Sequence, residues 1–529
     1  MMSKTLASEI TEEVEKRRTF AIISHPDAGK TTLTEKLLLF GGAIRLAGTV
    51  KGRKASKFAT SDWMEIEKQR GISVTSSVMQ FDYHGHRVNI LDTPGHQDFS
   101  EDTYRTLTAA DCAVMLIDSA KGVEVQTKKL FQVCRMRGIP IFTFINKLDR
   151  EGRDPFELLE ELEQVLGIRS YPMNWPIGQG KRLCGVYDRK KSQVELFQGE
   201  EEHKEIAVRK VSGYEDRLIA EMAGDHLYGQ LQQELELLDV AGDEYDDEKV
   251  QNGELTPVFF GSAINNFGVQ TFLENFLQLA PPPAPRNSTQ GAVEPFEERF
   301  SGYVFKIQAN MNPAHRDRIA FMRIVSGKFE RGMTVRHVRI GKEIKLAQPQ
   351  QFLAQDRDIV EHAYPGDIIG LFDPGIFRIG DSLSQGRDLE YDELPTFSPE
   401  LFSKVTVKNA MKHKQFQKGV DQLTEEGTIQ VFRTIGFDDL ILGVVGQLQF
   451  EVFEHRMRGE YGVEVILHRQ PYQFARWVVD PKIDPSKFRI NSVLVRDKKD
   501  NYVALFENEY AMRTAIEKNP SAKFLETAP

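Results

Sequence analysis

The residues with the clearest chemistry form a short run near the N-terminus. SHPDAGKTT, from Ser24 to Thr32, has the spacing of a G-x-x-x-x-G-K-[ST] phosphate-binding loop, with Ser24 at the position of the first glycine. In such a loop the backbone N–H groups and the N-terminus of the following helix bind phosphate oxygens. We expect Lys30 to reach the outer phosphates and the Thr31 hydroxyl to bind Mg²⁺.

A second motif, DTPGH, supplies an acid and a glycine for the same ligand. Asp92 follows the apolar run VNIL, and an acid at the end of a buried strand suits the binding of Mg²⁺ through water. Gly95 has no side chain, so its backbone N–H can come close to the last phosphate. The two motifs together predict a site for a nucleoside triphosphate.

The motif NKLD, from Asn146 to Asp149, indicates which base is bound. Guanine presents two adjacent donors, N1–H and N2–H₂, and the Asp149 carboxylate can accept both. Adenine has an acceptor at N1 and would leave this carboxylate unpaired, at a cost of about 1–3 kcal/mol. We expect Asn146 to hold neighbouring groups, Lys147 to pack along the base, and a backbone N–H of the GSA segment at 261–263 to donate to guanine O6. The sequence therefore predicts GTP and GDP as ligands and argues against an ATP-dependent kinase.

Strands and helices must place these motifs at one edge of a sheet. Apolar runs predict strands at 19–23, 88–91, 112–117, 139–145 and 257–260. Apolar residues at helical spacing predict helices at 32–40 and 127–137. Such an alternation forms a parallel sheet, and ligands bind at the carboxyl ends of its strands. The predicted nucleotide-binding residues follow these strands and are Ser24, His25, Pro26, Asp27, Ala28, Gly29, Lys30, Thr31, Thr32, Asp92, Thr93, Pro94, Gly95, His96, Asn146, Lys147, Leu148, Asp149, Ser262 and Ala263.

The set and order of these motifs resemble the translational GTPases, the superfamily of elongation factors Tu and G. In that family a histidine follows DTPG, and the resemblance implies that His96 is the catalytic residue, which orients the attacking water. The segment at 62–74 resembles the family's first switch, with Ser73 in place of the usual threonine. The implied metal ligands are Thr31, Ser73 and, through water, Asp92.

The resemblance also suggests what surrounds the catalytic histidine. Pro26 and Ile72 stand where the family has an apolar pair flanking it. We identify no arginine within the chain that stabilises the transition state; Arg53 and Arg70, near the first switch, are candidates that also suit a surface or RNA contact. We therefore expect slow hydrolysis by the isolated protein and stimulation by the ribosome.

Within this superfamily the chain resembles the bacterial peptide-chain release factor 3 family, through SHPDAGKTT, QRGISV and its overall length. The resemblance implies a multidomain α/β protein. We expect a P-loop GTPase domain with a mostly parallel sheet at 1–282, a β-barrel domain at 283–395, and a small α/β (α+β) domain at 396–529 that is similar to the third domain of elongation factor G. The proline-rich APPPAPR and the alternating segments after it, separated by Gly and Pro, favour the linker and the barrel.

The function implied by the resemblance is ribosome-dependent GTP hydrolysis that promotes dissociation of class I release factors after peptide release. The expected partners are the ribosome, through its RNA and proteins, and the class I release factors bound to it. Elongation factor G continues with two more domains, so translocation ranks lower for a chain of 529 residues. Two alternatives stay open: another ribosome task, such as rescue or stress response, and a guanine-nucleotide sensor with little hydrolysis.

Composition and charge indicate which partners and which cellular compartment suit the chain. The net charge of −10 argues against DNA binding, and three cysteines without a CxxC pair predict a reducing compartment. The chain has no apolar run long enough to span a bilayer, and its N-terminus reads as a charged helix, so we expect a cytoplasmic protein without a membrane partner. Lys404 to Lys418 is a basic stretch that suits either a ribosome contact or an exposed polar face. The acidic 200–250 segment is most simply solvated surface, and we expect a monomer.

Overall fold

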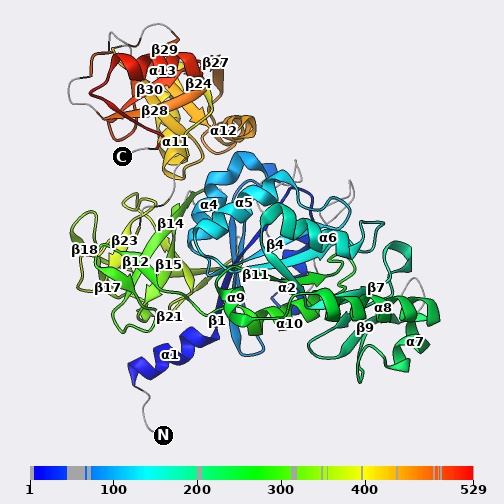
Figure 1. The fold of residues 1–529 in the computed structure, drawn as a ribbon. Helices are drawn as coiled ribbons and strands as arrows, with labels where there is room; N and C mark the ends of the chain where they lie inside the picture. The colour runs from blue at the N-terminus through cyan, green and yellow to red at the C-terminus, as the bar shows by residue number, and fades with distance from the viewer. Residues whose placement is uncertain are drawn as a thin grey trace.

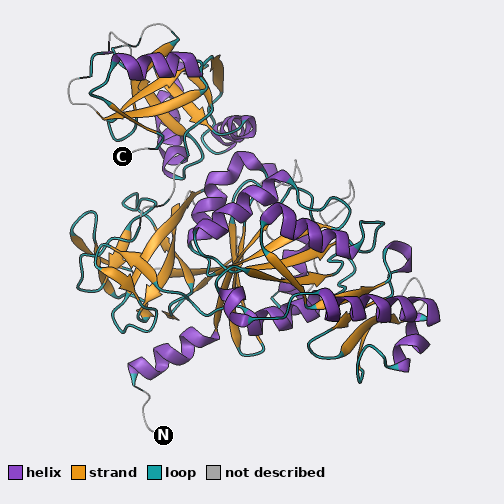
Figure 2. Cartoon of the chain, in the orientation of Figure 1, coloured by secondary structure: helices purple, strands orange, loops and turns teal. Residues whose placement is uncertain are grey.

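The computed structural model (Figure 1) describes residues 5–43, 66–67, 73–198, 205–310, 318–346, 349–353, 356–392, 394, 397–436, 439–479, 483–485, 488 and 491–527. Three groups of elements follow one another along the chain. Helix α1 (Leu6–Lys16) and a helix-flanked sheet come first, a group of short antiparallel strands follows, and a sheet with three α-helices ends the chain (Figure 2).

The first group is built on a mostly parallel sheet with the order β2-β3-β1-β4-β5-β11-β6. Its strands are β1 (Arg17–Ser24), β2 (Ser77–Tyr83), β3 (His86–Asp92), β4 (Cys112–Asp118), β5 (Ile141–Asn146), β6 (Arg169–Pro172) and β11 (Leu255–Phe260). All neighbours pair in parallel except β2, which is antiparallel to β3. The main helices around it are α2 (Lys30–Phe40), α4 (Ser100–Thr108), α5 (Val125–Met136), α6 (Pro155–Glu161) and α10 (Val269–Leu279).

The central strands are apolar because helices cover both faces of the sheet. Every residue of β1 is buried, and so is every residue of β4. Leu33 and Leu37 of α2 and Phe272 and Phe276 of α10 are fully buried in the same core. This core holds the strand ends in fixed register, which is what a binding site at the sheet edge requires.

The acidic 200–250 segment is part of an inserted layer. The antiparallel sheet β10-β9-β8-β7 and three helices are inserted between β6 and β11, and α7 and α8 lie beside this sheet (Figure 1). These elements are β7 (Asn174–Ile177), β8 (Gly185–Asp188), β9 (Gln193–Gln198), β10 (Glu205–Lys210), α7 (Arg217–Ala223), α8 (Asp225–Ala241) and α9 (Asp247–Gln251). Trp175 is buried here, and its Nε1–H donates to Glu234 Oε2 at 2.7 Å. The described part of the segment, 205–250, is therefore folded structure with exposed acidic side chains.

The second group consists of antiparallel strands around a core of its own, which includes Phe300, Val304 and Ile324. The strands are β12 (Arg286–Ser288), β13 (Gly291–Val293), β14 (Ser301–Ala309), β15 (Arg318–Ser326), β16 (Phe329–Glu330), β17 (Thr334–His337), β18 (Lys342–Lys345), β19 (Pro349–Leu353), β20 (Asp356–Ile359), β21 (His362–Ala363), β22 (Ile368–Phe372) and β23 (Ser382–Ser384). Among the described residues, the backbone pairing of Leu353 in β19 with Met79 in β2 joins this group to the first sheet.

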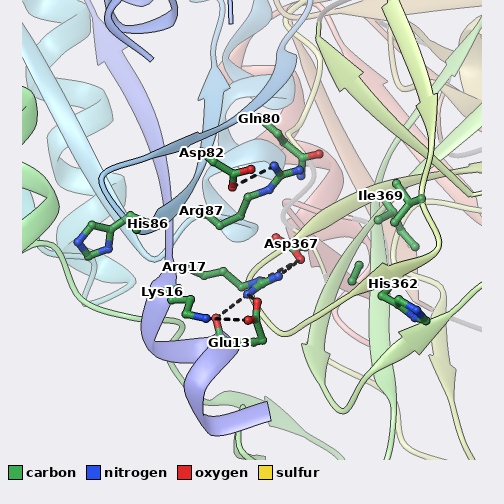
Figure 3. Close-up of a pocket in the computed structure, with 13 residues that line it drawn as sticks. Glu13, Lys16, Arg17, Gln80, Asp82, His86, Arg87, His362, Asp367 and Ile369 are labelled. Carbon is green, nitrogen blue, oxygen red and sulfur yellow. Dashed lines mark hydrogen bonds and ion pairs between the residues drawn. The ribbon is translucent and has the colours of Figure 1, made fainter. Parts of the chain in front are cut away.

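A cavity of about 450 Å³ lies where α1, the β2–β3 hairpin and the second group meet (Figure 3). Arg17 bridges it, since its guanidinium contacts Glu13 at 2.7 Å and Asp367 at 2.9 Å. None of the predicted nucleotide-binding residues lines this cavity. We interpret it as part of the contact between the first two groups.

The third group is an antiparallel sheet with the order β27-β24-β26-β25-β29-β30-β28-β31. Its strands are β24 (Leu401–Val407), β25 (Gln430–Thr434), β26 (Leu440–Val444), β27 (Val465–Gln470), β28 (Phe474–Val479), β29 (Ser492–Arg496), β30 (Tyr502–Phe506) and β31 (Lys523–Leu525), and its helices are α11 (His413–Glu425), α12 (Gln447–Gly459) and α13 (Glu509–Lys518). The predicted fold class, an α/β GTPase domain followed by a β domain and a small α/β domain, is confirmed. In the described part of the chain, no helix is both long and apolar enough to cross a membrane.

Candidate active site

The strand register brings the predicted motifs to one edge of the first sheet. Ile22 of β1 pairs with Asp92 of β3, and Asp118 of β4 pairs with Asn146 of β5. Phe260, which precedes the GSA segment, pairs with Ile145. The phosphate-binding loop, DTPGH, NKLD and GSA therefore begin side by side at the carboxyl ends of β1, β3, β5 and β11, as expected for a ligand site in such a sheet.

The backbone geometry of the phosphate-binding loop requires glycine at position 29. Gly29 caps α2 with a φ of 102°, and a Cβ there would lie 2.4 Å from Asn146 Nδ2. Only glycine fits both conditions. Lys30, at 7% exposure, places Nζ 2.5 Å from Asp92 Oδ1. This ion pair joins the first two motifs and compensates for the burial of the lysine.

The oxygen donors at this edge fit phosphate and Mg²⁺. The Ser24 hydroxyl is buried and has no hydrogen-bond partner among the described residues, so a phosphate oxygen would satisfy it. Thr31 lies in the first turn of α2 and Asp92 ends β3. A carboxylate with hydroxyl oxygens is the hard donor set that Mg²⁺ prefers, together with phosphate oxygens and water. Within the described residues there is no cluster of three His, Cys, Asp or Glu that could hold a metal by itself.

Asn146 connects the loops around the expected base site. Its Nδ2 donates to Ala28 O and its Oδ1 accepts from Ala263 N, each at 2.9 Å. Ser262 Oγ donates to Asp149 Oδ1 at 2.6 Å, which holds the carboxylate expected to recognise guanine. Leu148 is fully buried beneath these loops. One side chain thus ties the phosphate-binding loop to the GSA segment.

The backbone N–H groups of the GSA segment, one of which we expect to donate to guanine O6, have partners within the protein. The N–H groups of Gly261, Ser262 and Ala263 donate to Ile145 O, Phe267 O and Asn146 Oδ1, each at 2.9 Å. All three donors are used inside the protein because the segment makes a tight turn against β5. Ser262 and Ala263 contact Asp149 and Asn146 in this way, and the donation to guanine O6 stays a prediction.

Asp118 belongs to the site, although sequence reasoning did not select it. Lys147 Nζ donates to Asp118 Oδ2 at 2.7 Å and to Asp27 O at 2.5 Å. Burial raises the pKa of Asp118, but the hydrogen bonds from Lys147 and Ala120 outweigh it and hold the pKa below its ordinary value. The available signal was its place, because Asp118 directly follows the apolar run CAVMLI just as Asp92 follows VNIL.

His96 lies beside the phosphate-binding loop and begins a short 3₁₀ turn at Gln97–Phe99. A Cβ on the neighbouring Gly95 would lie 3.4 Å from Pro26 N, so the two loops are in contact. His96 Nδ1 is 3.3 Å from both the backbone N and the Oδ1 of Asp98. The hydrogen bond with Asp98 raises the pKa of His96, against the opposing effect of burial.

Other residues selected from the sequence fall outside the site or outside the described residues. Ile72, Arg53 and Arg70 lie outside the described residues, and so does most of the 62–74 segment. In the basic stretch, Lys404 pairs with Asp439 at 2.7 Å and Lys408 with Glu464 at 3.0 Å. Part of that positive charge is therefore neutralised at the protein surface.

Comparison with known proteins resolves which GTPase this site belongs to. Family models match in three parts: "Elongation factor Tu GTP binding domain" at 15–282, "Elongation factor G domain 2" at 299–386 and "Class II release factor RF3, C-terminal domain" at 391–516. A peptide chain release factor 3 from Symbiobacterium thermophilum is 64% identical over 522 residues, covering 98% of this chain and 99% of its own. The chain belongs to the release factor 3 family.

Other relatives agree with this assignment. Proteins named peptide chain release factor 3 from Listeria innocua and Macrococcus caseolyticus are each 58% identical, covering 97% of this chain and 98% and 99% of their own. A crystal structure from Thermus thermophilus has a TM-score of 0.70 at 24% identity, covering 92% of this chain and 72% of that one, and supports the fold alone. As a release factor 3 family member the chain is a guanine-nucleotide-binding GTPase of translation termination that interacts with the ribosome. A different ribosome task or a sensor without hydrolysis is not favoured.

Proposed function

We propose that this chain uses GTP to promote the dissociation of class I release factors from the ribosome after peptide release. The observation that carries the proposal is the contact between the loop bearing His96 and the C-terminal part of the chain, where Leu448 N donates to Asp98 Oδ2 at 2.7 Å. That C-terminal part is the one matched by the release factor 3 model. A change at the nucleotide can therefore be passed to the part of the chain specific to this family.

The proposed division of labour follows the family matches and the element groups. A nucleotide domain at 1–282 binds and hydrolyses GTP, and a β-barrel domain at 283–395 and an α/β domain at 396–529 contact the ribosome. We propose that the protein works as a monomer in the cytoplasm, with neither DNA nor a membrane as a partner. The net charge of −10 and the low cysteine content support this setting.

The residues proposed to bind the nucleotide act by position and charge. Lys30 offsets the charge of the outer phosphates, Gly95 N–H donates to the last phosphate, and Asp149 accepts from guanine N1–H and N2–H₂. Mg²⁺, when bound, offsets phosphate charge and would be held by Thr31, Ser73 and, through water, Asp92.

His96 is proposed to orient the attacking water. The neighbouring Gly95 stands against Pro26 of the phosphate-binding loop, so His96 follows directly on the segment expected to contact the last phosphate. We propose slow hydrolysis by the isolated protein and stimulation by the ribosome, as the family resemblance implies. A nucleotide-dependent preference for one ribosome conformation would loosen the class I factor, and hydrolysis would release this protein.

The direct test is the release of a labelled class I release factor from post-termination ribosomes. Purified protein is added with GTP, with GDP, or without nucleotide. We expect faster dissociation with GTP alone. Unchanged dissociation, with ribosome-stimulated hydrolysis intact, would keep the GTPase assignment and remove its role in releasing class I factors.

A further inference from the structure

Asp98 occupies a position between two parts of the chain that are 350 residues apart in sequence. On one side its carboxylate Oδ1 lies 3.3 Å from His96 Nδ1. On the other side its Oδ2 accepts the Leu448 N–H at 2.7 Å. Leu448 is the second residue of α12, so the carboxylate accepts a hydrogen bond from one of the free N–H groups at the positive end of that helix. We infer that Asp98 is a positioning residue for His96, and that the N-terminus of α12 holds Asp98 in place.

The sequence of α12 makes room for this contact. Gly446 precedes the helix, and a Cβ there would lie 2.0 Å from Asp98 Cγ. Any side chain at 446 would therefore displace the carboxylate, because the two groups would occupy the same space. The glycine does not serve a left-handed turn, since its φ is −142°. It permits the close approach of Asp98.

Apolar packing keeps the two parts together around the carboxylate. Phe99 lies in one buried cluster with Ile66 and Val74 of the first domain and with Val452 of α12, and Leu448 packs against it. Arg105 of α4 adds hydrogen bonds to the carbonyls of Glu426 and Gly427, at 3.2 and 3.3 Å. The contact is thus an interface with an apolar core and polar partners, and Asp98 is its link to the catalytic loop.

Asp98 offers His96 Nδ1 a partner in both protonation states. Its backbone N–H, at 3.3 Å, donates to an unprotonated Nδ1, and its Oδ1 accepts from a protonated one. Among the described residues, Asp98 is the one charged group that shifts the pKa of His96. Helix α12 contacts Asp98 through the backbone N–H of Leu448, which carries no charge. Burial raises the pKa of Asp98, but the bonds from His96 and Leu448 outweigh it and keep the pKa low, so the carboxylate stays charged at neutral pH. Nε2 is then free to face the water.

The inference rests on the proposed role of His96, and its test separates the two. The variants are Asp98→Asn, which can still accept the Leu448 N–H but carries no charge, and Gly446→Ala, which keeps every charge and displaces the carboxylate. Asp216→Asn is the matched control, because Asp216 accepts Leu218 N at 3.0 Å at the start of α7, in the inserted layer. Each variant is checked for cooperative unfolding and for GDP affinity.

Two readouts are measured on the full-length chain. The first is the titration midpoint of the His96 ring by NMR of histidine-labelled protein with GDP and with no ribosome, its signal assigned through His96→Gln. The second is ribosome-stimulated GTP hydrolysis as a function of pH. We expect both Asp98→Asn and Gly446→Ala to lower the His96 midpoint and to reduce hydrolysis at least about tenfold, with GDP affinity unchanged. Asp216→Asn should change neither.

The outcomes are distinct. A wild-type His96 midpoint in folded Asp98→Asn and Gly446→Ala overturns the inference. Lowered His96 midpoints with unchanged GTP hydrolysis overturn the inference as well. In that case Asp98 would affect the titration of the ring, but hydrolysis would not depend on Asp98. If the wild type shows no ribosome-stimulated hydrolysis, the proposed function fails, and the NMR titration alone still decides whether Asp98 and α12 fix the His96 ring.

Discussion

Replacement of Asn146 by Ala tests how the base site is held together. Asn146 is 2% exposed, and its amide makes two hydrogen bonds, to Ala28 O and from Ala263 N, each 2.9 Å long. Alanine removes both bonds and leaves one acceptor and one donor without their partner. The phosphate-binding loop and the GSA segment then lose their direct link.

The size of the effect follows from the two orphaned groups. Each buried group left unpaired costs about 1–3 kcal/mol, so we expect the free energy of unfolding to fall by about 2–6 kcal/mol. The loops must also be ordered by the nucleotide itself when it binds. We expect the affinity for GDP to fall about tenfold, which corresponds to about 1.4 kcal/mol.

The assay compares urea unfolding of the nucleotide-free protein with fluorescent GDP titration. Asn275→Ala is the control, because Asn275 is also buried and donates to Asp188 Oδ2 at 2.9 Å and to Thr271 O at 3.0 Å, in α10 and away from the site. It should lose comparable stability and keep wild-type GDP affinity. The reasoning is refuted if Asn146→Ala binds GDP like the wild type, or if Asn275→Ala weakens GDP binding equally.

Three further predictions concern specificity and stability. Asp149→Asn should weaken guanine-nucleotide binding by about 1–3 kcal/mol. The variant should gain affinity for xanthosine triphosphate, whose base has a carbonyl at C2 where guanine has an amino group. Competition titrations measure both affinities, and an unchanged preference for GTP would contradict the prediction. Burial raises the pKa of Glu195 from 4.5 to about 7, so the folded state keeps a proton that the unfolded state has released, and stability falls as pH rises between these values. Glu195→Gln should therefore stabilise the protein at pH 8 by up to about 3 kcal/mol and leave it unchanged at pH 4, and equal unfolding curves at pH 8 would count against this. Lys306 is buried, donates to Thr75 Oγ1 and lies 3.5 Å from Asp102, whose side chain is 21% exposed. Lys306→Met should therefore cost about 1–3 kcal/mol in urea unfolding by leaving a partly buried carboxylate without its cation, and wild-type stability would show the pair to be dispensable.

The nucleotide-binding edge could be predicted from sequence because its strands are buried on both faces. Such strands appear as continuous apolar runs, and β1 and β4 extend beyond the predicted runs at 19–23 and 112–117 by one or two residues. The motifs are short and directly follow these runs, so the parallel sheet alone places them together. Their ligand roles remain predictions that the proposed variants test.

Contacts between distant segments could not be predicted in the same way. Nothing local to Asp98 or Gly446 shows that a carboxylate will meet a helix N-terminus 350 residues away, because that contact depends on how the groups of elements pack. The GSA segment illustrates a second limit, since the partners of its N–H groups depend on a turn that its sequence does not specify. The same holds for charge: Lys404 and Lys408 form part of a basic run in sequence but face acids in the fold.

The most direct test of the central claim is the rate of GTP hydrolysis by the wild type and by His96→Ala, with and without post-termination ribosomes. His226→Ala serves as control, because His226 is an exposed histidine on α8 in the inserted layer. The account predicts slow hydrolysis by the isolated proteins, strong stimulation of the wild type and of His226→Ala by ribosomes, and a loss of at least about a hundredfold in His96→Ala at unchanged GTP affinity. Full ribosome-stimulated hydrolysis by His96→Ala, or turnover by the wild type that ribosomes do not change, would contradict it.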